Sequence, residues 1–179
     1  MRILFAAAVA LSMTGIAAAA ATDPCAQTRS SKVTLEEGRE LIVTASTLPG
    51  PVAPEGGGDN CRLATAVFTI HTTEGYAVAT YAAAVIAASY DLGHTQEAVP
   101  AAKLGAFLDE WIKVEIATAD KAPAATDEGV TINASAEDYE AIKSAKAPMV
   151  CFKETEHTTA CFAPDASGYL IPLFEREQF

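Results

Sequence analysis

Four cysteines constrain the fold of this chain more than any other feature of its sequence. They are Cys25, Cys61, Cys151 and Cys161. An even number of cysteines can pair into disulfides that tie distant parts of a chain together. Disulfides persist in oxidising compartments and are rare in the cytosol. Their interpretation therefore depends on whether the sequence carries an export signal.

Residues 1–21 have the composition of a secretory signal. Arg2 supplies the positive charge, a long apolar stretch follows, and Ala19 and Ala21 are the small residues that a signal peptidase needs. The stretch is rich in alanine and broken by polar residues, which argues against a permanent membrane anchor. We therefore expect cleavage after Ala21. The product would be a single soluble domain, residues 22–179, that is periplasmic or secreted and has no membrane contact after cleavage.

Export makes disulfides the natural state of the four cysteines. Three pairings are possible, and we favour Cys25–Cys61 with Cys151–Cys161. The second pair encloses a short polar segment that is typical of a hairpin, and a bond between neighbouring strands suits disulfide geometry. A zinc site formed by Cys151, His157 and Cys161 is the alternative, but its spacing matches no structural zinc pattern. We expect no bound metal and no cofactor.

The chain is acidic. It has 23 Asp and Glu against 12 Lys and Arg, which gives a formal net charge of −11. Removal of residues 1–21 would take Arg2 away and make the rest of the chain one unit more negative. Nucleic acids and anionic membranes are poor partners for such a chain, because phosphate binding needs clustered cations. A basic protein is the more natural partner.

Hydrophobic patterning predicts an α+β fold, with a mainly antiparallel sheet and two short helices, that is disulfide-bonded. Residues 100–113 carry an apolar stripe at helical spacing, and Ser135 has the position of an N-cap for a second helix. Gly75 is expected at positive φ in a hairpin turn, and residues 48–60 are expected to form a loop because they hold three Pro and four Gly. Residues 82–89 fit either a strand or a short helix. The predicted strands are 40–45, 61–71, 76–81, 114–118, 130–133, 149–153, 159–162 and 169–174.

The sequence contains none of the familiar catalytic motifs. It lacks a Gly-x-Ser-x-Gly elbow, a His-Glu-x-x-His pair and the glycine motifs that bind phosphates or dinucleotides. The densest polar cluster includes Glu154, Glu156 and His157. A glutamate of this cluster could act with His157 or with His71 as an acid–base pair. These four residues are the candidate catalytic residues.

A turn near the C-terminus supplies candidate binding residues. Ser167, Gly168 and Tyr169 lie between two predicted strands. In this respect the turn resembles the Ser-Gly-Tyr loop of small periplasmic lysozyme inhibitors, which are disulfide-bonded β-rich domains. Tyr169 follows Gly168 directly, without the spacer of that family, and the two predicted helices do not fit a pure β architecture. The family is therefore not assigned.

Three functions remain open. The absence of catalytic motifs, the acidity and the expected disulfides favour a non-catalytic binding or inhibitory module that acts on a basic protein. The first alternative is a hydrolase that uses a Glu/His pair. The second is a structural accessory of an envelope complex, which should expose a contiguous apolar patch.

Overall fold

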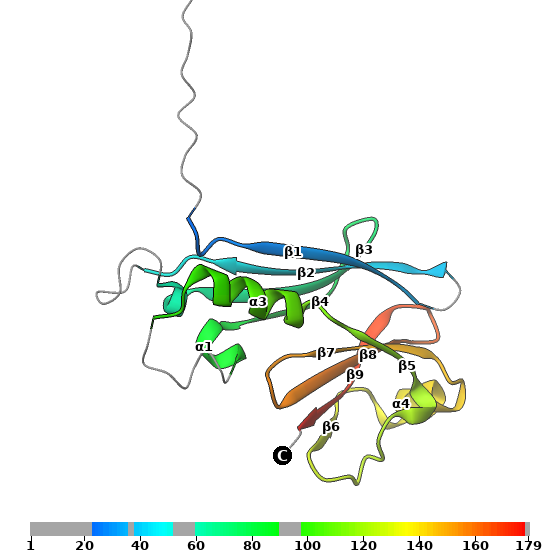
Figure 1. Ribbon diagram of the computed structural model, residues 1–179. Coiled ribbons are helices and arrows are strands. Elements are labelled where there is room, and N and C mark those ends of the chain that lie inside the picture. The colour runs from blue at the N-terminus through cyan, green and yellow to red at the C-terminus, as the bar shows by residue number, and fades with distance from the viewer. Residues whose placement is uncertain (1–22, 36–37, 52–59, 90–97, 178–179) are drawn as a thin grey trace, which may run out of the picture.

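The computed structural model describes residues 23–35, 38–51, 60–89 and 98–177. The expected signal, residues 1–21, and most of the predicted loop at 48–60 lie outside these ranges. The fold is α+β, as the patterning predicted, and it contains two antiparallel sheets (Figure 1). No helix within the described ranges has the length and apolar character needed to cross a membrane.

The first sheet has the strand order β1-β2-β3-β4 and is built from consecutive hairpins. Side chains alternate across it, so that Phe68 and Ile70 are buried on the inner face while Val67 and Thr69 are only half-buried. The strands are β1 (Thr28–Thr34), β2 (Glu40–Leu48), β3 (Thr65–Thr72) and β4 (Ala77–Ala84), with a 3-10 helix, η2 (Cys61–Leu63), before β3 and a short helix, α1 (Val85–Ala88), after β4.

The second sheet has the order β5-β7-β8-β9-β6. Its centre is a meander of three strands that correspond to those predicted at 149–153, 159–162 and 169–174, and β5 and β6 add to its two edges. The elements are β5 (Glu115–Thr118), a 3-10 helix η3 (Ala119–Lys121), β6 (Val130–Ile132), β7 (Pro148–Lys153), β8 (Thr158–Pro164) and β9 (Leu170–Glu177).

The second sheet lies between the first sheet and a helix, α4 (Ala136–Ser144). The alternation along β7 explains this arrangement. Phe152 points toward the first sheet and stacks on Phe68, with ring centroids 4.2 Å apart. Cys151 points the other way, into a separate core that contains Tyr139 of α4.

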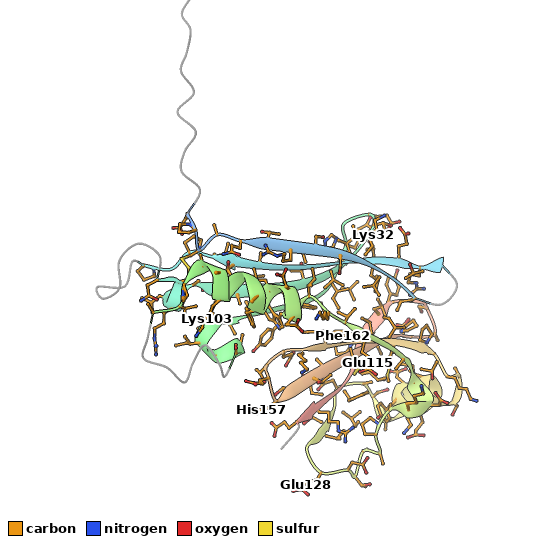
Figure 2. The ribbon with its side chains drawn as sticks, viewed as in Figure 1. Lys32, Lys103, Glu115, Glu128, His157 and Phe162 are labelled. Atoms are coloured by element: carbon orange, nitrogen blue, oxygen red, sulfur yellow. A yellow bond between two sulfur atoms is a disulfide. The ribbon has the colours of Figure 1, made fainter. Side chains whose placement is uncertain are left out.

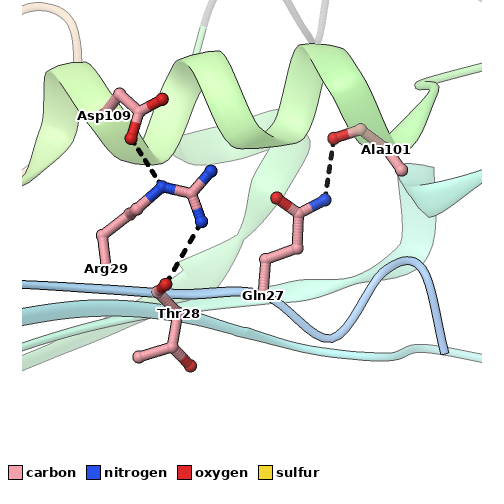
Figure 3. Close-up of polar contacts among 5 residues, drawn as sticks. All are labelled: Gln27, Thr28, Arg29, Ala101 and Asp109. Carbon is pink, nitrogen blue, oxygen red and sulfur yellow. Dashed lines mark hydrogen bonds and ion pairs between the residues drawn. The ribbon is translucent and has the colours of Figure 1, made fainter. Parts of the chain in front are cut away.

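A longer helix, α3 (Ala101–Trp111), covers part of the inner face of the first sheet. Its predicted stripe is buried at Leu104, Leu108 and Trp111. Two side chains hold its outer side to the chain around β1, as Figure 3 shows. The Gln27 amide donates to the Ala101 carbonyl at 2.8 Å, and the Arg29 guanidinium bonds to Asp109 at 2.5 Å.

Both expected disulfides are present, Cys25–Cys61 and Cys151–Cys161. The first joins the segment before β1 to η2. The second joins two residues that face each other directly across β7 and β8. Among the described residues there is no free cysteine.

The structure differs from the prediction in several places. The strand predicted at 61–71 begins only at Thr65, because Cys61–Leu63 form η2. The structure has two sheets, and the first begins with β1, which was not predicted because Val33 is the only large apolar residue in that strand. The ambiguous segment 82–89 divides, since β4 runs to Ala84 and α1 follows. The last strand begins at Leu170, because Tyr169 belongs to the preceding turn.

Candidate binding site

Three turns meet at one end of the molecule and border a common groove. They are the turns between β1 and β2, between β3 and β4, and between β8 and β9. Each contains a glycine with positive φ: 76° at Gly38, 90° at Gly75 and 82° at Gly168. Glycine adopts this conformation without the steric cost that other residues meet. The value at Gly75 confirms the predicted hairpin turn.

The β8–β9 turn is held in one shape by its first residue. One carboxylate oxygen of Asp165 accepts hydrogen bonds from the backbone N–H groups of Ser167 and Tyr169, at 2.8 and 2.9 Å. The Asp165 N–H in turn donates to the Tyr169 carbonyl at 2.8 Å. An aspartate that bonds to the backbone in this way is a common means of closing a turn. Tyr169 is therefore presented on a fixed backbone.

The β3–β4 turn is closed in a similar way around a second tyrosine. The Thr72 N–H donates to the Tyr76 carbonyl at 2.9 Å, and the Tyr76 N–H donates to the Thr72 hydroxyl at 3.3 Å. Tyr76 follows Gly75 as Tyr169 follows Gly168. The two tyrosines thus occupy equivalent positions, each directly after the glycine of its turn.

Arg39 connects the β1–β2 turn to the β8–β9 turn. Its guanidinium donates to the Gly168 carbonyl at 2.7 Å. A Cβ atom on Gly168 would come within 3.2 Å of the same guanidinium. The bond joins residues 129 positions apart in sequence and links the first sheet to the second at this end.

The groove between the turns has a volume of about 640 Å³, and both tyrosines line it. Tyr76 is 73% exposed and Tyr169 is 74% exposed, the highest values among the large hydrophobic side chains described. We call this surface the tyrosine groove; it is lined by Gly38, Arg39, Glu40, Leu41, Thr72, Thr73, Glu74, Tyr76, Ala77, Val78, Gly168, Tyr169 and Leu170.

The rim of the tyrosine groove carries ionised groups of both signs. Hydrogen bonds from the hydroxyls of Thr72 and Thr73 lower the pKa of the Glu74 carboxyl, so that it stays charged. The other carboxylate, Glu40, pairs with Lys32 at 3.3 Å. Arg39 is engaged by the Gly168 carbonyl. Glu74 is thus a rim carboxylate that forms no ion pair with any residue that the structure describes.

The sequence identified one side of this groove and missed the other. Gly168 and Tyr169 line it as parts of the predicted binding turn, and Ser167 is exposed in the same turn. Tyr76 and Arg39 were not singled out. The repeated Gly-Tyr dipeptide at the two turns was a usable signal for Tyr76, whereas the bond from Arg39 to Gly168 depends on tertiary packing.

The candidate catalytic residues lie elsewhere. Glu154, Glu156 and His157 share the β7–β8 turn, and Figure 2 shows His157 at its tip. This turn is at the end of the second sheet opposite the β8–β9 turn. His71 is in β3 beside the β3–β4 turn, where its Nδ1 lies 3.2 Å from the Thr72 carbonyl oxygen. The acid–base pairing of a glutamate with either histidine stays a prediction.

The Glu154 carboxyl of that turn has a raised pKa. Burial raises the pKa of its carboxyl, and the nearby Glu175 carboxylate raises it further. Burial and then the charge of Glu154 likewise raise the pKa of Tyr81. Within the described ranges, no group of three or more His, Cys, Asp or Glu side chains is placed to hold a metal ion.

Comparison with known proteins does not assign a family or a fold relative to this chain. No family model matches the chain, and no curated protein and no solved structure matches it.

Proposed function

We propose that this protein is an exported, non-catalytic binding or inhibitory module that engages a basic partner protein through the tyrosine groove. The observation that carries the proposal is the pair of exposed tyrosines on either side of one groove. Tyrosine gives a large contact area with few rotatable bonds, and it is enriched at protein interfaces and among the residues that dominate binding energy. Two such rings on rigid turns favour recognition over catalysis.

Rigidity supports the proposal. The Asp165 carboxylate, the Thr72 hydroxyl and the Arg39 guanidinium each fix the backbone that carries a tyrosine. A surface that is already ordered loses less conformational entropy when it binds. The tyrosine groove therefore needs little rearrangement to receive a partner.

The charge of the groove and of the chain supports a basic partner. Glu74 stands ionised on the rim, and the chain as a whole carries a formal charge of −11. Complementary charge raises association rates and selects among partners. We expect an arginine or lysine of the partner to lie against Glu74, with its neighbouring side chains against the two tyrosine rings.

Export is part of the same proposal. The signal-like residues 1–21 and the two disulfides support a periplasmic or secreted product. Mass spectrometry of the protein recovered from the periplasm or the medium should find Thr22 as its first residue. Recovery of the full-length chain from the cytosol would contradict export.

Binding is tested against a panel of basic cell-wall hydrolases, by biosensor affinity and by inhibition of their activity. For any hydrolase that binds, Tyr76→Ala and Tyr169→Ala should each weaken binding by about tenfold or more, the size typical of a dominant interface residue. Leu48→Ala is the matched control, because Leu48 is 57% exposed at the opposite end of β2. Equal affinity of the double tyrosine variant and the wild type would overturn the assignment of the groove.

A further inference from the structure

The first sheet ends in the edge strands β1 and β4, and the second sheet ends in β5 and β6 (Figure 1). An edge strand presents unpaired N–H and C=O groups, and proteins usually protect such edges with charges, prolines or very short strands. β5 and β6 have only 4 and 3 residues. β1 carries Arg29 and Lys32, and Arg29 is bonded to Asp109 of α3. Among the strands that the structure describes, these edges are protected.

β4 is the exception. It contains no charged residue and no proline, although 20% of the residues in the chain are charged. Its register with β3 shifts between Ile70 and His71, near the start of β4, and the strand then pairs with β3 without a break from Ala79 to Ala84. A regular, uncharged edge of this length is typical of a strand that pairs with another chain.

The ladder identifies which backbone groups of β4 point outward. The Val85 N–H donates to the Ala64 carbonyl at 3.0 Å. Hydrogen-bonded and non-bonded pairs alternate in an antiparallel ladder, so every second residue back from Val85 bonds to β3, and Tyr81 is one of them. Thr80 and Ala82, on either side of Tyr81, therefore direct their N–H and C=O groups away from β3. No strand in the described ranges lies on that side of β4.

We propose that β4 pairs with the β4 strand of a second copy of this protein. The two strands run antiparallel and join the first sheets of both copies into one continuous sheet. Thr80 of each copy lies opposite Ala82 of the other, and each such pair exchanges both of its backbone hydrogen bonds. This register satisfies the groups that β3 leaves unpaired. The two-fold axis passes between the Tyr81 residues of the two copies.

The side chains of β4 suit pairing with an identical strand. Tyr81 is half-buried on the inner face and packs edge-on against Trp111, with ring centroids 6.2 Å apart. In the dimer it faces the same tyrosine of the second copy, and aromatic pairs across neighbouring strands are favourable. On the outer face the small side chains of Thr80 and Ala82 meet without obstruction.

The absence of charge on β4 favours a second copy over the basic partner of the tyrosine groove. A two-fold axis brings each group close to its own equivalent, so a charged residue near the axis would repel itself. β4 has no such residue. A basic partner would gain nothing from an uncharged strand, because its affinity for this acidic chain depends on carboxylates.

Sedimentation velocity of the oxidised chain from Thr22 onward tests the proposal, since the described fold begins at Asp23. Edge pairing buries a small area, so we expect a weak dimer whose mass changes from one copy to two between about 1 µM and 1 mM. The formal charge of −11 on each chain opposes association. Raising NaCl from about 0.05 to 0.5 M should therefore tighten the dimer several-fold, because salt screens this repulsion. Weaker association at high salt would indicate intermolecular ion pairs and contradict the proposal.

Two proline variants compare the two edges of the first sheet. Ala82→Pro removes an N–H that the second copy needs and that β3 does not use, so it should weaken dimerisation by at least about tenfold and leave each copy folded. Ser30→Pro is the matched control. The Thr47 N–H donates to the Gln27 carbonyl at 2.8 Å, so the same alternation turns the Ser30 N–H away from β2. This variant should dimerise like the wild type.

Amide hydrogen exchange, measured by NMR, tests the same contact without a substitution. The N–H groups of Thr80 and Ala82 should exchange more slowly at about 1 mM protein than at about 0.05 mM, because the dimer protects them. The N–H groups of Ser30 and Lys32, on the opposite edge, should exchange rapidly at both concentrations.

Three results would overturn the proposal. They are a single copy at every concentration, equal weakening by Ala82→Pro and Ser30→Pro, or exchange at Thr80 and Ala82 that does not depend on concentration. A single copy with rapid exchange at both amides would instead indicate that this edge receives an extended segment of another protein. The tyrosine groove is tested separately, because the double tyrosine variant should dimerise like the wild type.

Discussion

Lys146 holds a conformation that its side chain disfavours. Its φ is 51°, and it is the one non-glycine residue with positive φ in the described ranges. It follows Ala145, the C-cap residue of α4. Its N–H donates to the Lys143 carbonyl and the Ala147 N–H donates to the Ile142 carbonyl, at 3.0 and 3.2 Å. These two hydrogen bonds form a Schellman motif, which closes the C-terminus of a helix and usually has glycine at the position that Lys146 occupies here.

Replacing this lysine by glycine should therefore stabilise the protein. Lys146→Gly removes the steric cost of positive φ, partly offset by the greater freedom of glycine in the unfolded chain. We expect the free energy of unfolding, measured with urea, to rise by about 0.5–1 kcal/mol. Lys146→Ala removes the same charge and keeps the strain, so a similar gain in that variant would contradict the explanation.

Glu154 should make stability depend on pH. Burial, and then the charge of Glu175, raise the pKa of its carboxyl in the folded state. The folded protein therefore keeps a proton on Glu154 at pH values where the unfolded chain has lost it. The stability that this proton contributes is complete below the ordinary pKa of glutamate and is lost as the pH rises through the raised pKa.

Glu154→Gln should remove this loss. At pH 7 the variant should be more stable than the wild type by about 0.5 kcal/mol, a small value because solvent screens a half-exposed group. The difference should disappear below about pH 4, where both forms are neutral. Urea unfolding across this pH range measures it. Once Glu154 is neutral, Glu175→Gln should add nothing, and an additive gain would show that the two carboxylates do not interact.

At the scale of elements, α3 and β1 are joined through side chains that surround Gly105. A Cβ atom at this position would lie 3.0 Å from the Gln27 amide oxygen and 3.1 Å from the Arg29 guanidinium. Both are the far ends of flexible side chains that already bond to α3 (Figure 3). Alanine at position 105 would favour the helical conformation, but its methyl group would also displace the Gln27 and Arg29 side chains from their contacts with α3.

Gly105→Ala should therefore raise the free energy of unfolding by less than the difference in helix propensity between alanine and glycine. Glycine costs about 1 kcal/mol relative to alanine inside a helix, and we expect a smaller gain in the wild-type background. In a Gln27→Ala background the contact at 3.0 Å is gone and only the Arg29 guanidinium, at 3.1 Å, remains close, so the gain should be larger than in the wild type. The difference between the two backgrounds, measured by thermal or urea unfolding, is the coupling energy, and additivity of the two changes would refute the contact.

Local patterns predicted the elements better than their arrangement. The stripe that ends in Trp111 and the cap at Ser135, which accepts from the Asp138 N–H at 3.0 Å, were readable because each depends on neighbours within one helix. β1 was missed because its burial alternates without a strong apolar face. The hydrogen bond from Trp111 to Lys153 spans 42 residues, and no local pattern encodes such a contact.

At the scale of the whole molecule, the two disulfides close loops of different length in different parts of the fold. Cys151–Cys161 joins strands that already pair through the β7–β8 hairpin, and it closes a separation of only 10 residues. Cys25–Cys61 closes a separation of 36 residues and ties the start of the first sheet to η2. The loss of conformational freedom that a disulfide imposes on the unfolded chain grows with the length of the loop it closes. Cys25–Cys61 should therefore contribute more to the free energy of unfolding than Cys151–Cys161.

Paired alanine variants separate the two contributions. Cys25→Ala with Cys61→Ala should lower the free energy of unfolding by about 4 kcal/mol, and Cys151→Ala with Cys161→Ala by about 3 kcal/mol, from loop entropy alone. All four cysteines are buried, so the transfer cost of removing sulfur is similar in each pair and largely cancels in the comparison. Alanine also avoids placing an unpaired hydroxyl in the core. Urea unfolding of both pairs measures the order. If the shorter loop proves the costlier to open, packing around Cys151 and Cys161 in the core beneath α4 outweighs chain entropy, and the second sheet depends on its bond more than its hairpin suggests.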